Sequence, residues 1–261
     1  MNLKILDKLE VGMKSIGDQI NTWRCNNSTE RDILEPNLFK TKADIKANKL
    51  IKELIASLDP NKSIISEEDS EFKLDRPKAY WLIDPIDGTA SWYGGFDGYV
   101  TQISYIENGS PIYGAVYAPV LNKFWSAFRG NGAYLNGKKL SLLKYKKRFI
   151  LIDNYPKPKR IAKKISDNFN IDKYIECGSL GLKSCLVADG SADLFIKDVV
   201  VRDWDIAPAK VILDEVGGIL FDLNGNSIDF CDSHEKTSGL IVARDKHLAS
   251  QIVQFTQDLI L

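Results

Sequence analysis

The sequence has little of three features that often direct interpretation: an excess of one charge, long apolar runs and histidine. Its 35 basic residues balance its 35 acidic residues, so the chain as a whole has no charge that would attract nucleic acid. No apolar run approaches the length of a membrane span, and we expect no membrane partner. The two histidines, His234 and His247, lie outside the acidic motifs described below, which argues against a phosphohistidine mechanism.

Cysteine is also scarce. The four cysteines show neither metal-ligand spacing nor the density of a disulfide scaffold: Cys25, Cys177, Cys185 and Cys231. Isolated thiols of this kind are typical of a reducing compartment. Because the N-terminus also lacks the pattern of a signal peptide, we expect a cytoplasmic protein.

The pattern of apolar residues predicts helices first, then mostly antiparallel strands, then alternating helices and strands. Apolar residues with helical spacing predict amphipathic helices over 3–23 and 41–58. Strands follow between residues 80 and 135, and helices alternate with strands after residue 148. This order predicts a layered α/β (α+β) sandwich with mixed and antiparallel sheets. We divide it into an N-terminal half, 1–145, and a C-terminal half, 146–261.

Two Asn-Gly pairs, at 108–109 and 136–137, predict hairpin turns. The second pair lies within residues 132–138, which spell Gly, four residues, Gly and Lys, as in a phosphate-binding loop. Lys139 follows where such a loop has Ser or Thr, and no buried strand leads into a helix here. We therefore interpret this segment as a hairpin rather than as a nucleotide site.

Residues 81–89 read Trp-Leu-Ile-Asp-Pro-Ile-Asp-Gly-Thr and form the most informative segment of the chain. The apolar start predicts the end of a buried strand, which delivers Asp84 and Asp87 on a rigid turn. Gly88 lets the backbone approach a ligand closely, and Thr89 adds a hydroxyl group. Two carboxylates followed by free backbone N–H groups suit a magnesium ion that holds a phosphate. An ordinary strand-exit turn is the alternative.

Acidic residues in two other places could join this segment. Glu67 follows a short apolar run, and Asp203 and Asp205 precede a predicted helix over 206–216. A two-metal phosphoryl-transfer centre needs several carboxylates to neutralise its ions. Taken singly, Glu67 with Glu68 could be a solvated loop, and the two aspartates could be helix caps. In combination and in this order, the three places indicate a metal centre.

The combination resembles the inositol monophosphatase superfamily of metal-dependent, typically lithium-sensitive phosphomonoesterases. Residues 84–89 match its acid-Pro-Ile/Leu-Asp-Gly-Thr signature, and residues 204–209 followed by 217–218 match its second signature. Residues 114–119 and 130–137 also fit the family pattern. The resemblance implies a five-layer αβαβα fold, a small phosphorylated substrate and a homodimer.

The resemblance also implies which residues hold the metal. Glu67, Asp84 and the carbonyl oxygen of Ile86 would hold a first Mg²⁺ ion. Asp84, Asp87 and Asp205 would hold a second, and Glu67 would also reach a third, weaker ion. The N-terminal half would therefore carry most of the ligands, and the C-terminal half would carry Asp205 and the substrate contacts.

The same resemblance assigns the catalytic residues Asp44, Glu67 and Thr89. The amides of Gly88 and Thr89 would receive the phosphate, and Asp44 would pair with the Thr89 hydroxyl to orient the attacking water. Lys42 departs from the family pattern, which often has a hydroxyl residue there. The implied mechanism is direct in-line attack by metal-activated water, without a covalent intermediate.

Two branches of the superfamily compete for the identity of the substrate. Substrate contacts in the family come from the segment at Gly178 and Ser179, which here continues to Lys183. A cation at Lys183 would suit the uncleaved phosphate of 3′-phosphoadenosine 5′-phosphate, which favours a 3′(2′),5′-bisphosphate nucleotidase that releases AMP. The alternative for Lys183 is a solvent-facing helix residue.

Other residues favour an inositol-1-monophosphatase. Asp198 lies seven residues before Asp205, and at that distance the inositol branch has an acid that binds sugar hydroxyl groups. Counting forward from Asp193 instead places Lys197 at this position, because the stretch between Asp193 and Asp205 is one residue longer here. Ala90 also stands where the nucleotidases often have lysine. A third alternative is a metal-binding regulatory protein with a protein or RNA partner. It is disfavoured because the acidic residues of the centre are all present.

Overall fold

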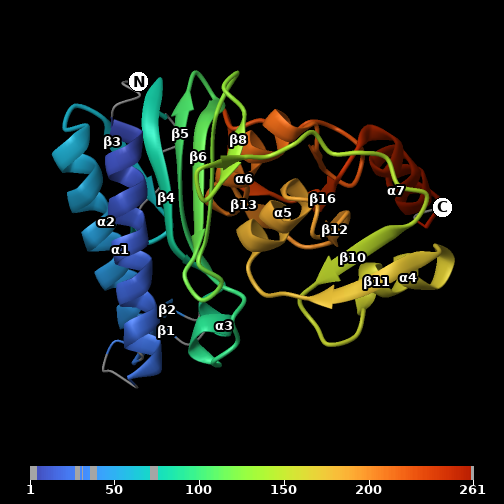
Figure 1. Cartoon of the computed structure of the whole chain (residues 1–261), viewed down its shortest axis with the longest axis horizontal. Coiled ribbons are helices and arrows are strands. Elements are labelled where there is room, and N and C mark those ends of the chain that lie inside the picture. Colours follow the sequence, from blue (N-terminus) through green and yellow to red (C-terminus); the bar gives the residue numbers. More distant parts are fainter. Residues whose placement is uncertain (1–4, 27–29, 31, 36–39, 71–75, 260–261) are drawn as a thin grey trace.

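The chain folds into five alternating layers of helices and sheets (Figure 1). The computed structural model describes residues 5–26, 30, 32–35, 40–70 and 76–259. Helices α1 and α2 form the first layer, and a seven-stranded sheet forms the second. Helices α5 and α6 form the third, a five-stranded sheet the fourth, and α4 with α7 the fifth. The predicted αβαβα sandwich is confirmed.

The longer helices each bury an apolar stripe against a sheet. The helix bounds are α1 (Leu6–Cys25), α2 (Lys42–Leu58), α3 (Thr89–Tyr93), α4 (Arg160–Asn168), α5 (Leu180–Ala188), α6 (Asp203–Val216) and α7 (Lys246–Asp258). The first two agree with the predicted helices, except that residues 3–4 of the first prediction lie outside the described residues.

The seven-stranded sheet has the order β3-β4-β5-β6-β7-β8-β9, and β3–β4 is its parallel pair. The five-stranded sheet has the order β11-β10-β12-β16-β14, in which β10 runs parallel to β11 and β12. Ribbons β1–β2 and β13–β15 complete the described strands. The strand bounds are β1 (Ile33–Glu35), β2 (Lys40–Thr41), β3 (Ser63–Ser66), β4 (Ala79–Asp87), β5 (Val100–Glu107), β6 (Ser110–Ala118), β7 (Lys123–Phe128), β8 (Ala133–Leu135), β9 (Lys138–Lys139), β10 (Phe149–Asp153), β11 (Ile171–Glu176), β12 (Leu194–Lys197), β13 (Val201–Arg202), β14 (Ile219–Phe221), β15 (Glu235–Lys236) and β16 (Leu240–Ala243).

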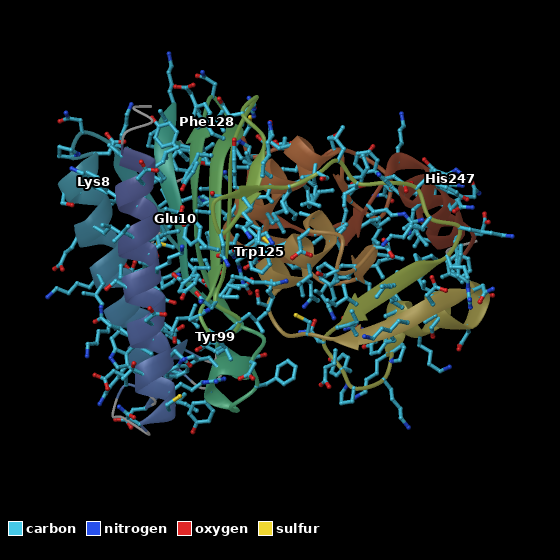
Figure 2. The ribbon with its side chains drawn as sticks, viewed as in Figure 1. Lys8, Glu10, Tyr99, Trp125, Phe128 and His247 are labelled. Atoms are coloured by element: carbon cyan, nitrogen blue, oxygen red, sulfur yellow. The ribbon has the colours of Figure 1, made fainter. Side chains whose placement is uncertain are left out.

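Three apolar clusters lie between the layers. The first joins α1 and α2 to the large sheet, where the rings of Trp81 and Tyr105 meet edge to face at 5.0 Å. The central cluster joins both sheets through α5 and α6 and includes Trp125 of the large sheet (Figure 2). The third joins the small sheet to α4 and α7. Because the central cluster draws residues from both halves, the halves share a core, and the boundary at residue 145 stays a prediction.

Helix α6 lies between the two sheets and is apolar on most sides. Ala207 and Ala209 are fully buried, and a methyl group at Gly114 of β6 would overlap the Pro208 carbonyl oxygen. Small residues on both elements therefore let the helix approach the sheet closely. This packing fixes the position of the helix N-terminus, and with it Asp205, relative to the large sheet.

Two local predictions next to the acidic motif are wrong. Strand β4 continues to Asp87, and its register with β5 shifts between Asp84 and Asp87. The two aspartates therefore flank a bulge within a strand rather than a turn. Pro85 fits there because it has no N–H group for a regular ladder. Helix α6 begins at Asp203 rather than at residue 206, so both of its aspartates lie in the first turn.

Both Asn-Gly pairs form the predicted hairpin turns. Asn108, Gly109, Asn136 and Gly137 all have positive φ angles, as this turn type requires. The second turn joins β8 to β9, so residues 132–138 are a hairpin and not a phosphate-binding loop. In the described ranges no helix is both long and apolar enough to cross a bilayer.

Candidate active site

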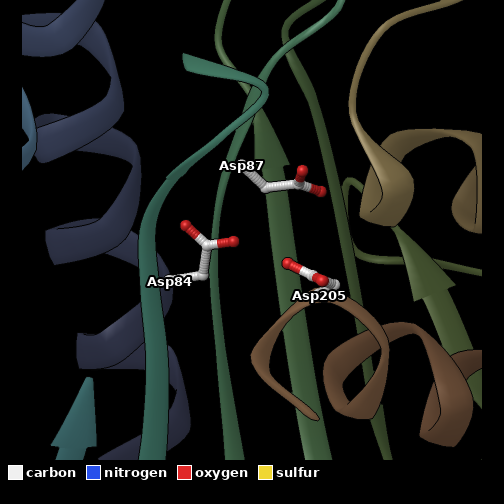
Figure 3. Close-up of side chains that lie close together, drawn as sticks. All are labelled: Asp84, Asp87 and Asp205. Atoms are coloured by element: carbon white, nitrogen blue, oxygen red, sulfur yellow. The ribbon is translucent and has the colours of Figure 1, made fainter. Parts of the chain in front are cut away.

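Three aspartates meet where the bulge of β4 faces the start of α6 (Figure 3). Asp84 and Asp87 come from β4, and Asp205 comes from the first turn of α6. One carboxylate oxygen from each residue lies within 4.8 Å of those of the other two, and Figure 3 shows the three groups facing a common space. The fold thus brings together acidic residues that are more than a hundred positions apart in the sequence.

The first turn of α5 holds the carboxylate of Asp87. Its Oδ2 accepts hydrogen bonds from the Ser179 hydroxyl at 2.5 Å and from the Gly181 amide at 2.6 Å. Its Oδ1 accepts one from the Leu180 amide at 3.2 Å. Ser179 also caps the helix, since its Oγ accepts a hydrogen bond from the Leu182 amide. Ser179 therefore orients an acidic residue of the centre, and its contact with substrate stays a prediction.

Gln102 of β5 is a buried residue that contacts Asp84 and Asp87, and no sequence motif predicts its role. Its Nε2 donates to the Trp204 carbonyl oxygen at 3.0 Å. The same nitrogen lies 3.3 Å from Asp84 Oδ2 and 3.4 Å from Asp87 Oδ2. Gln102 belongs to no motif, and only its position opposite Asp84 in the strand pairing could have drawn attention to it.

Asp205 belongs to the acidic group and also caps its own helix. Its Oδ2 accepts a hydrogen bond from the Arg202 amide at 2.7 Å, as the capping alternative predicted. The neighbouring Asp203 lies outside the group of three. It is fully buried and pairs with Arg76 at 2.6 Å and with Lys236 at 3.3 Å. The cap and the acidic centre are thus compatible at Asp205, whereas Asp203 has a structural ion pair.

The electrostatics of the group fit a bound divalent cation. Burial, followed by repulsion from neighbouring carboxylates, raises the pKa of both Asp84 and Asp205 well above the ordinary 3.8. Asp84 Oδ1 is buried, and no donor among the described residues reaches it. Mg²⁺ prefers carboxylate oxygens, and its charge would remove the repulsion between them.

Glu67 lies beside this group, directly after β3. Burial and the adjacent Glu68 raise the pKa of Glu67 to about 7, and a hydrogen bond with Asp84 opposes part of this shift. Glu68 has a side chain that is only 6% exposed and pairs with Lys40 at 2.7 Å. The alternative of a solvated acidic pair is therefore wrong, and metal binding by Glu67 stays a prediction.

Thr89 and Asp44 form the pair that the resemblance implied. Thr89 Oγ1 lies 3.1 Å from Asp44 Oδ1 and 2.9 Å from the Ile86 carbonyl oxygen, an implied metal ligand. Asp44 Oδ2 accepts hydrogen bonds from the Thr41 amide and hydroxyl at the start of α2. Lys42 pairs with Asp32 at an exposed position, so it leaves this arrangement undisturbed.

Glycines form the wall on which the phosphate is expected. Gly88 has a φ of 92°, and a methyl group there would lie 2.8 Å from the Gly98 carbonyl oxygen. A methyl group at Gly178 would overlap the same oxygen. That oxygen accepts a hydrogen bond from the Ser179 amide at 2.7 Å. Close backbone contact therefore links the α3 and α5 segments next to the aspartates.

The structure corrects both interpretations of Lys183. Its side chain is fully buried, so it is not a solvent-facing residue and does not reach an open site. The ammonium group donates to Asn154 Oδ1 at 2.7 Å and to the Gly178 carbonyl oxygen, and it lies 4.7 Å from the centre of the Phe195 ring. Burial lowers the pKa of Lys183 from 10.5 to about 8. Lys183 therefore stabilises the Gly178 segment by a buried hydrogen bond.

A cavity of about 250 Å³ has Leu180 in its lining, and the amide of Leu180 binds Asp87. Its lining includes Asp153, Asn154, Tyr155, Lys159, Arg160, Lys197 and Asp198. Lys197 pairs with Asp153, and Arg160 lies 3.5 Å from Asp198. Lys159 lies 4.3 Å from the centre of the Tyr155 ring and has no acidic partner within the described part of the chain. Both Asp198 and Lys197 thus line one cavity, and substrate binding by Asp198 stays a prediction.

Comparison with known proteins agrees with this geometry. The sequence model of the inositol monophosphatase family matches residues 11–261. The 3′(2′),5′-bisphosphate nucleotidase CysQ of Aggregatibacter actinomycetemcomitans is 31% identical over 228 residues, which is 84% of either chain. Inositol monophosphatase 1 of Solanum lycopersicum is 30% identical over 212 residues, 76% of this chain and 75% of the relative. The solved structure of inositol monophosphatase II from Staphylococcus aureus has a TM-score of 0.79 at 25% identity, covering 95% of this chain and 92% of that one.

Proposed function

The chain belongs to the inositol monophosphatase family and is a phosphatase of phosphate monoesters, and from this premise we propose that it is a Mg²⁺-dependent 3′(2′),5′-bisphosphate nucleotidase. Its substrate would be 3′-phosphoadenosine 5′-phosphate and its product AMP. The proposal combines the acidic centre, which suits phosphoryl transfer, with the cavity beside it, which suits a second phosphate.

Some residues of the centre would bind the metal ion, and others would orient the attacking water. Asp84, Asp87 and Asp205 would supply oxygen ligands for Mg²⁺, and the charge of the ion would offset the repulsion that raises the pKa of Asp84. When bound, Mg²⁺ lowers the pKa of a water molecule and neutralises charge on the phosphoryl oxygens. Asp44 Oδ1 accepts a hydrogen bond from the Thr89 hydroxyl group, so a lone pair of Thr89 Oγ1 can accept a hydrogen bond from the attacking water.

The remaining groups of the centre orient the phosphate and complete the ligands. The amides of Gly88 and Thr89 follow the bulge directly, where the backbone is held against Gly98. Glu67, whose pKa of about 7 reflects burial and Glu68, lies beside Asp84 and would add a ligand once it has lost its proton. In-line attack then needs no covalent intermediate on the protein.

The observation that carries the choice of substrate is Lys159 with Tyr155. The other two cations of the cavity, Arg160 and Lys197, already face acidic partners, whereas the ammonium group of Lys159 lies over the Tyr155 ring and has no acidic partner among the described residues. A free ammonium group next to an aromatic face suits a ligand with a second phosphate and a flat base. Lys159 thus takes the role that the sequence had suggested for Lys183.

Phosphate release tests this proposal. With Mg²⁺ present, 3′-phosphoadenosine 5′-phosphate and inositol 1-phosphate are compared under identical conditions, and the nucleotide should be hydrolysed with the higher kcat/KM. Lys159→Ala should raise the KM for the nucleotide about tenfold, the usual effect of one charged hydrogen bond, and leave inositol 1-phosphate unchanged. Lys157→Ala, an exposed lysine two residues away that does not line the cavity, is the matched control.

The alternative function is an inositol-1-monophosphatase, which the place of Asp198 in the same cavity favours. A preference for inositol 1-phosphate, with loss of activity in Asp198→Asn, would establish it. Release from neither ester would favour the regulatory protein with a protein or RNA partner. Inhibition by Li⁺, a cytoplasmic location and a homodimer also stay predictions.

A further inference from the structure

Gln102 is placed at the centre of the acidic group by strand pairing. It lies on β5 directly opposite Asp84, on the face that also receives the starts of α5 and α6. Its side chain is fully buried, so it is not exposed to a substrate. The position is therefore suited to holding the ligands and not to binding the phosphate ester.

The amide nitrogen of Gln102 connects the segments that carry the three aspartates. Its shortest hydrogen bond, at 3.0 Å, goes to the Trp204 carbonyl oxygen in the first turn of α6, and Asp205 O lies at 3.5 Å. The longer contacts, at 3.3 and 3.4 Å, go to Oδ2 of Asp84 and of Asp87. An NH₂ group has two hydrogens, so one serves the helix backbone and the other is shared between the two carboxylates.

The surroundings determine which end of the amide faces the aspartates. All four contacts of the nitrogen are acceptors, so an oxygen in that place would be repelled. The Oε1 end faces Gly181, where a methyl group would overlap it. Glycine at 181 thus allows the first turn of α5 to reach Asp87 and Gln102 together.

The chemistry of an amide suits this place better than the alternatives. A glutamate would add a negative charge to a group of buried acids, and a lysine would compete with a metal cation. An apolar residue would leave the Trp204 carbonyl without its donor. The neutral amide donates to one oxygen of each carboxylate and leaves Asp84 Oδ1 free of donors.

We propose that Gln102 is a positioning residue that holds Asp84, Asp87 and the start of α6 in ligating geometry, so that its loss weakens binding of Mg²⁺ rather than of the phosphate ester. This inference rests on the proposed metal-dependent function but not on the choice of substrate. Residues that orient metal ligands through hydrogen bonds typically change metal affinity by about 10- to 100-fold when they are replaced.

The test uses Gln102→Met, which keeps the length of the side chain and removes the donor. Ser104→Ala is the matched control, because Ser104 is buried on the same face two residues further along β5 but donates to the Tyr113 carbonyl oxygen. Calorimetric titration with Mg²⁺ in the absence of substrate measures metal affinity directly, and kinetics at saturating Mg²⁺ measure KM.

In Gln102→Met the affinity for Mg²⁺ should fall at least tenfold, while KM for the phosphate ester stays within about twofold of the wild type. Ser104→Ala should bind Mg²⁺ like the wild type. Equal Mg²⁺ affinity in both variants would overturn the proposal, as would a rise in KM alone. If Gln102→Met does not fold, Gln102→Asn, which retracts the amide by one methylene group, is judged by the same criteria. Wild-type protein that binds Mg²⁺ but hydrolyses neither ester would refute the proposed function, and the Mg²⁺ titrations of the variants would still test the role of Gln102.

Discussion

Asp87 shows how single residues in the centre are restrained before any ion binds. Three donors from the first turn of α5 hold its carboxylate, and the strongest of them, Ser179 Oγ and the Gly181 amide, share one oxygen. Burial still raises the pKa of Asp87, although the Ser179 hydrogen bond opposes that shift. Asp84, by contrast, keeps a buried oxygen without a donor. Both carboxylate oxygens of Asp87 thus accept hydrogen bonds from the protein, whereas Oδ1 of Asp84 accepts none from the described residues.

Replacing Lys183 by Met tests the role of this single buried residue. Replacement by Met removes the hydrogen bonds to Asn154 and to the Gly178 carbonyl oxygen while keeping most of the side-chain volume. Because Lys183 acts through the Gly178 segment, kcat/KM should fall about tenfold for both the nucleotide and inositol 1-phosphate, as expected for about 1.4 kcal/mol. Steady-state kinetics with both esters measure this. A loss confined to the nucleotide would contradict the assignment and restore direct phosphate binding.

At the scale of the element, the start of α5 and the bulge of β4 depend on each other. The helix is capped by Ser179, whose hydroxyl group also binds Asp87 of the bulge. The bulge in turn places Asp84 and Asp87 on the same side of the sheet, which a regular strand would not do for residues three positions apart. Helix capping and ligand placement therefore use the same atoms.

Gly181→Ala tests this dependence. Alanine is favoured over glycine in a helix by up to about 1 kcal/mol, so the change would stabilise α5 if space were available. The added methyl group would overlap Gln102 Oε1 and lie 3.1 Å from Asp87 Oδ2, and overpacking of this kind costs about 1–3 kcal/mol. We expect a lower Tm and a kcat reduced at least tenfold.

Gly12→Ala is the control for this substitution. Gly12 lies in α1, and a methyl group there meets only the flexible end of the Leu54 side chain. Its kcat should remain that of the wild type. A Gly181→Ala variant that is more stable and fully active would show that α5 can withdraw from Gln102 without consequence for the centre.

At the scale of the whole molecule, the acidic centre lies where the large sheet and the central helices meet. Helix α6 presents Asp205 from one side, and β4 presents Asp84 and Asp87 from the other (Figure 3), so burial of the acids follows from the packing of the layers. Folding without metal therefore brings carboxylates together that prefer to be protonated.

The metal-free protein should accordingly lose stability as the pH rises. Burial and Glu68 raise the pKa of Glu67 from 4.5 to about 7, so its contribution to stability is fully present below pH 4.5 and is lost as the pH rises through 7. The raised pKa of Asp84, caused by burial and the nearby Glu67, acts in the same direction. Tm without metal should fall by on the order of 5 °C between pH 5 and pH 7.5.

Calorimetric scans with and without Mg²⁺ measure this effect. Mg²⁺ should raise Tm more at pH 7.5 than at pH 5, because the ion replaces the protons as the counter-charge. Asp84→Asn removes one of the interacting carboxylates and should flatten the dependence of the metal-free Tm on pH. An unchanged slope in Asp84→Asn would place the pH-sensitive groups elsewhere in the protein.

The sequence by itself determined the layers, the hairpins and the acidic motifs. Helical and strand periodicities are local, and each layer needs only one apolar stripe or face to be recognised. The Asn-Gly turns at 108–109 and 136–137 are local for the same reason. Asp84, Asp87 and Asp205 could be identified because their residue types and their order along the chain are visible without any coordinates.

Only the tertiary structure decided the roles of Gln102, Glu68 and Lys183. Each depends on a partner far away in the chain: Gln102 binds the carbonyl of Trp204, Glu68 pairs with Lys40, and Lys183 reaches the side chain of Asn154. A buried polar group is defined by what surrounds it, and those surroundings come from elements packed together across layers. Sequence patterns report which face of an element is buried, but they do not report which distant donor or acceptor meets it there.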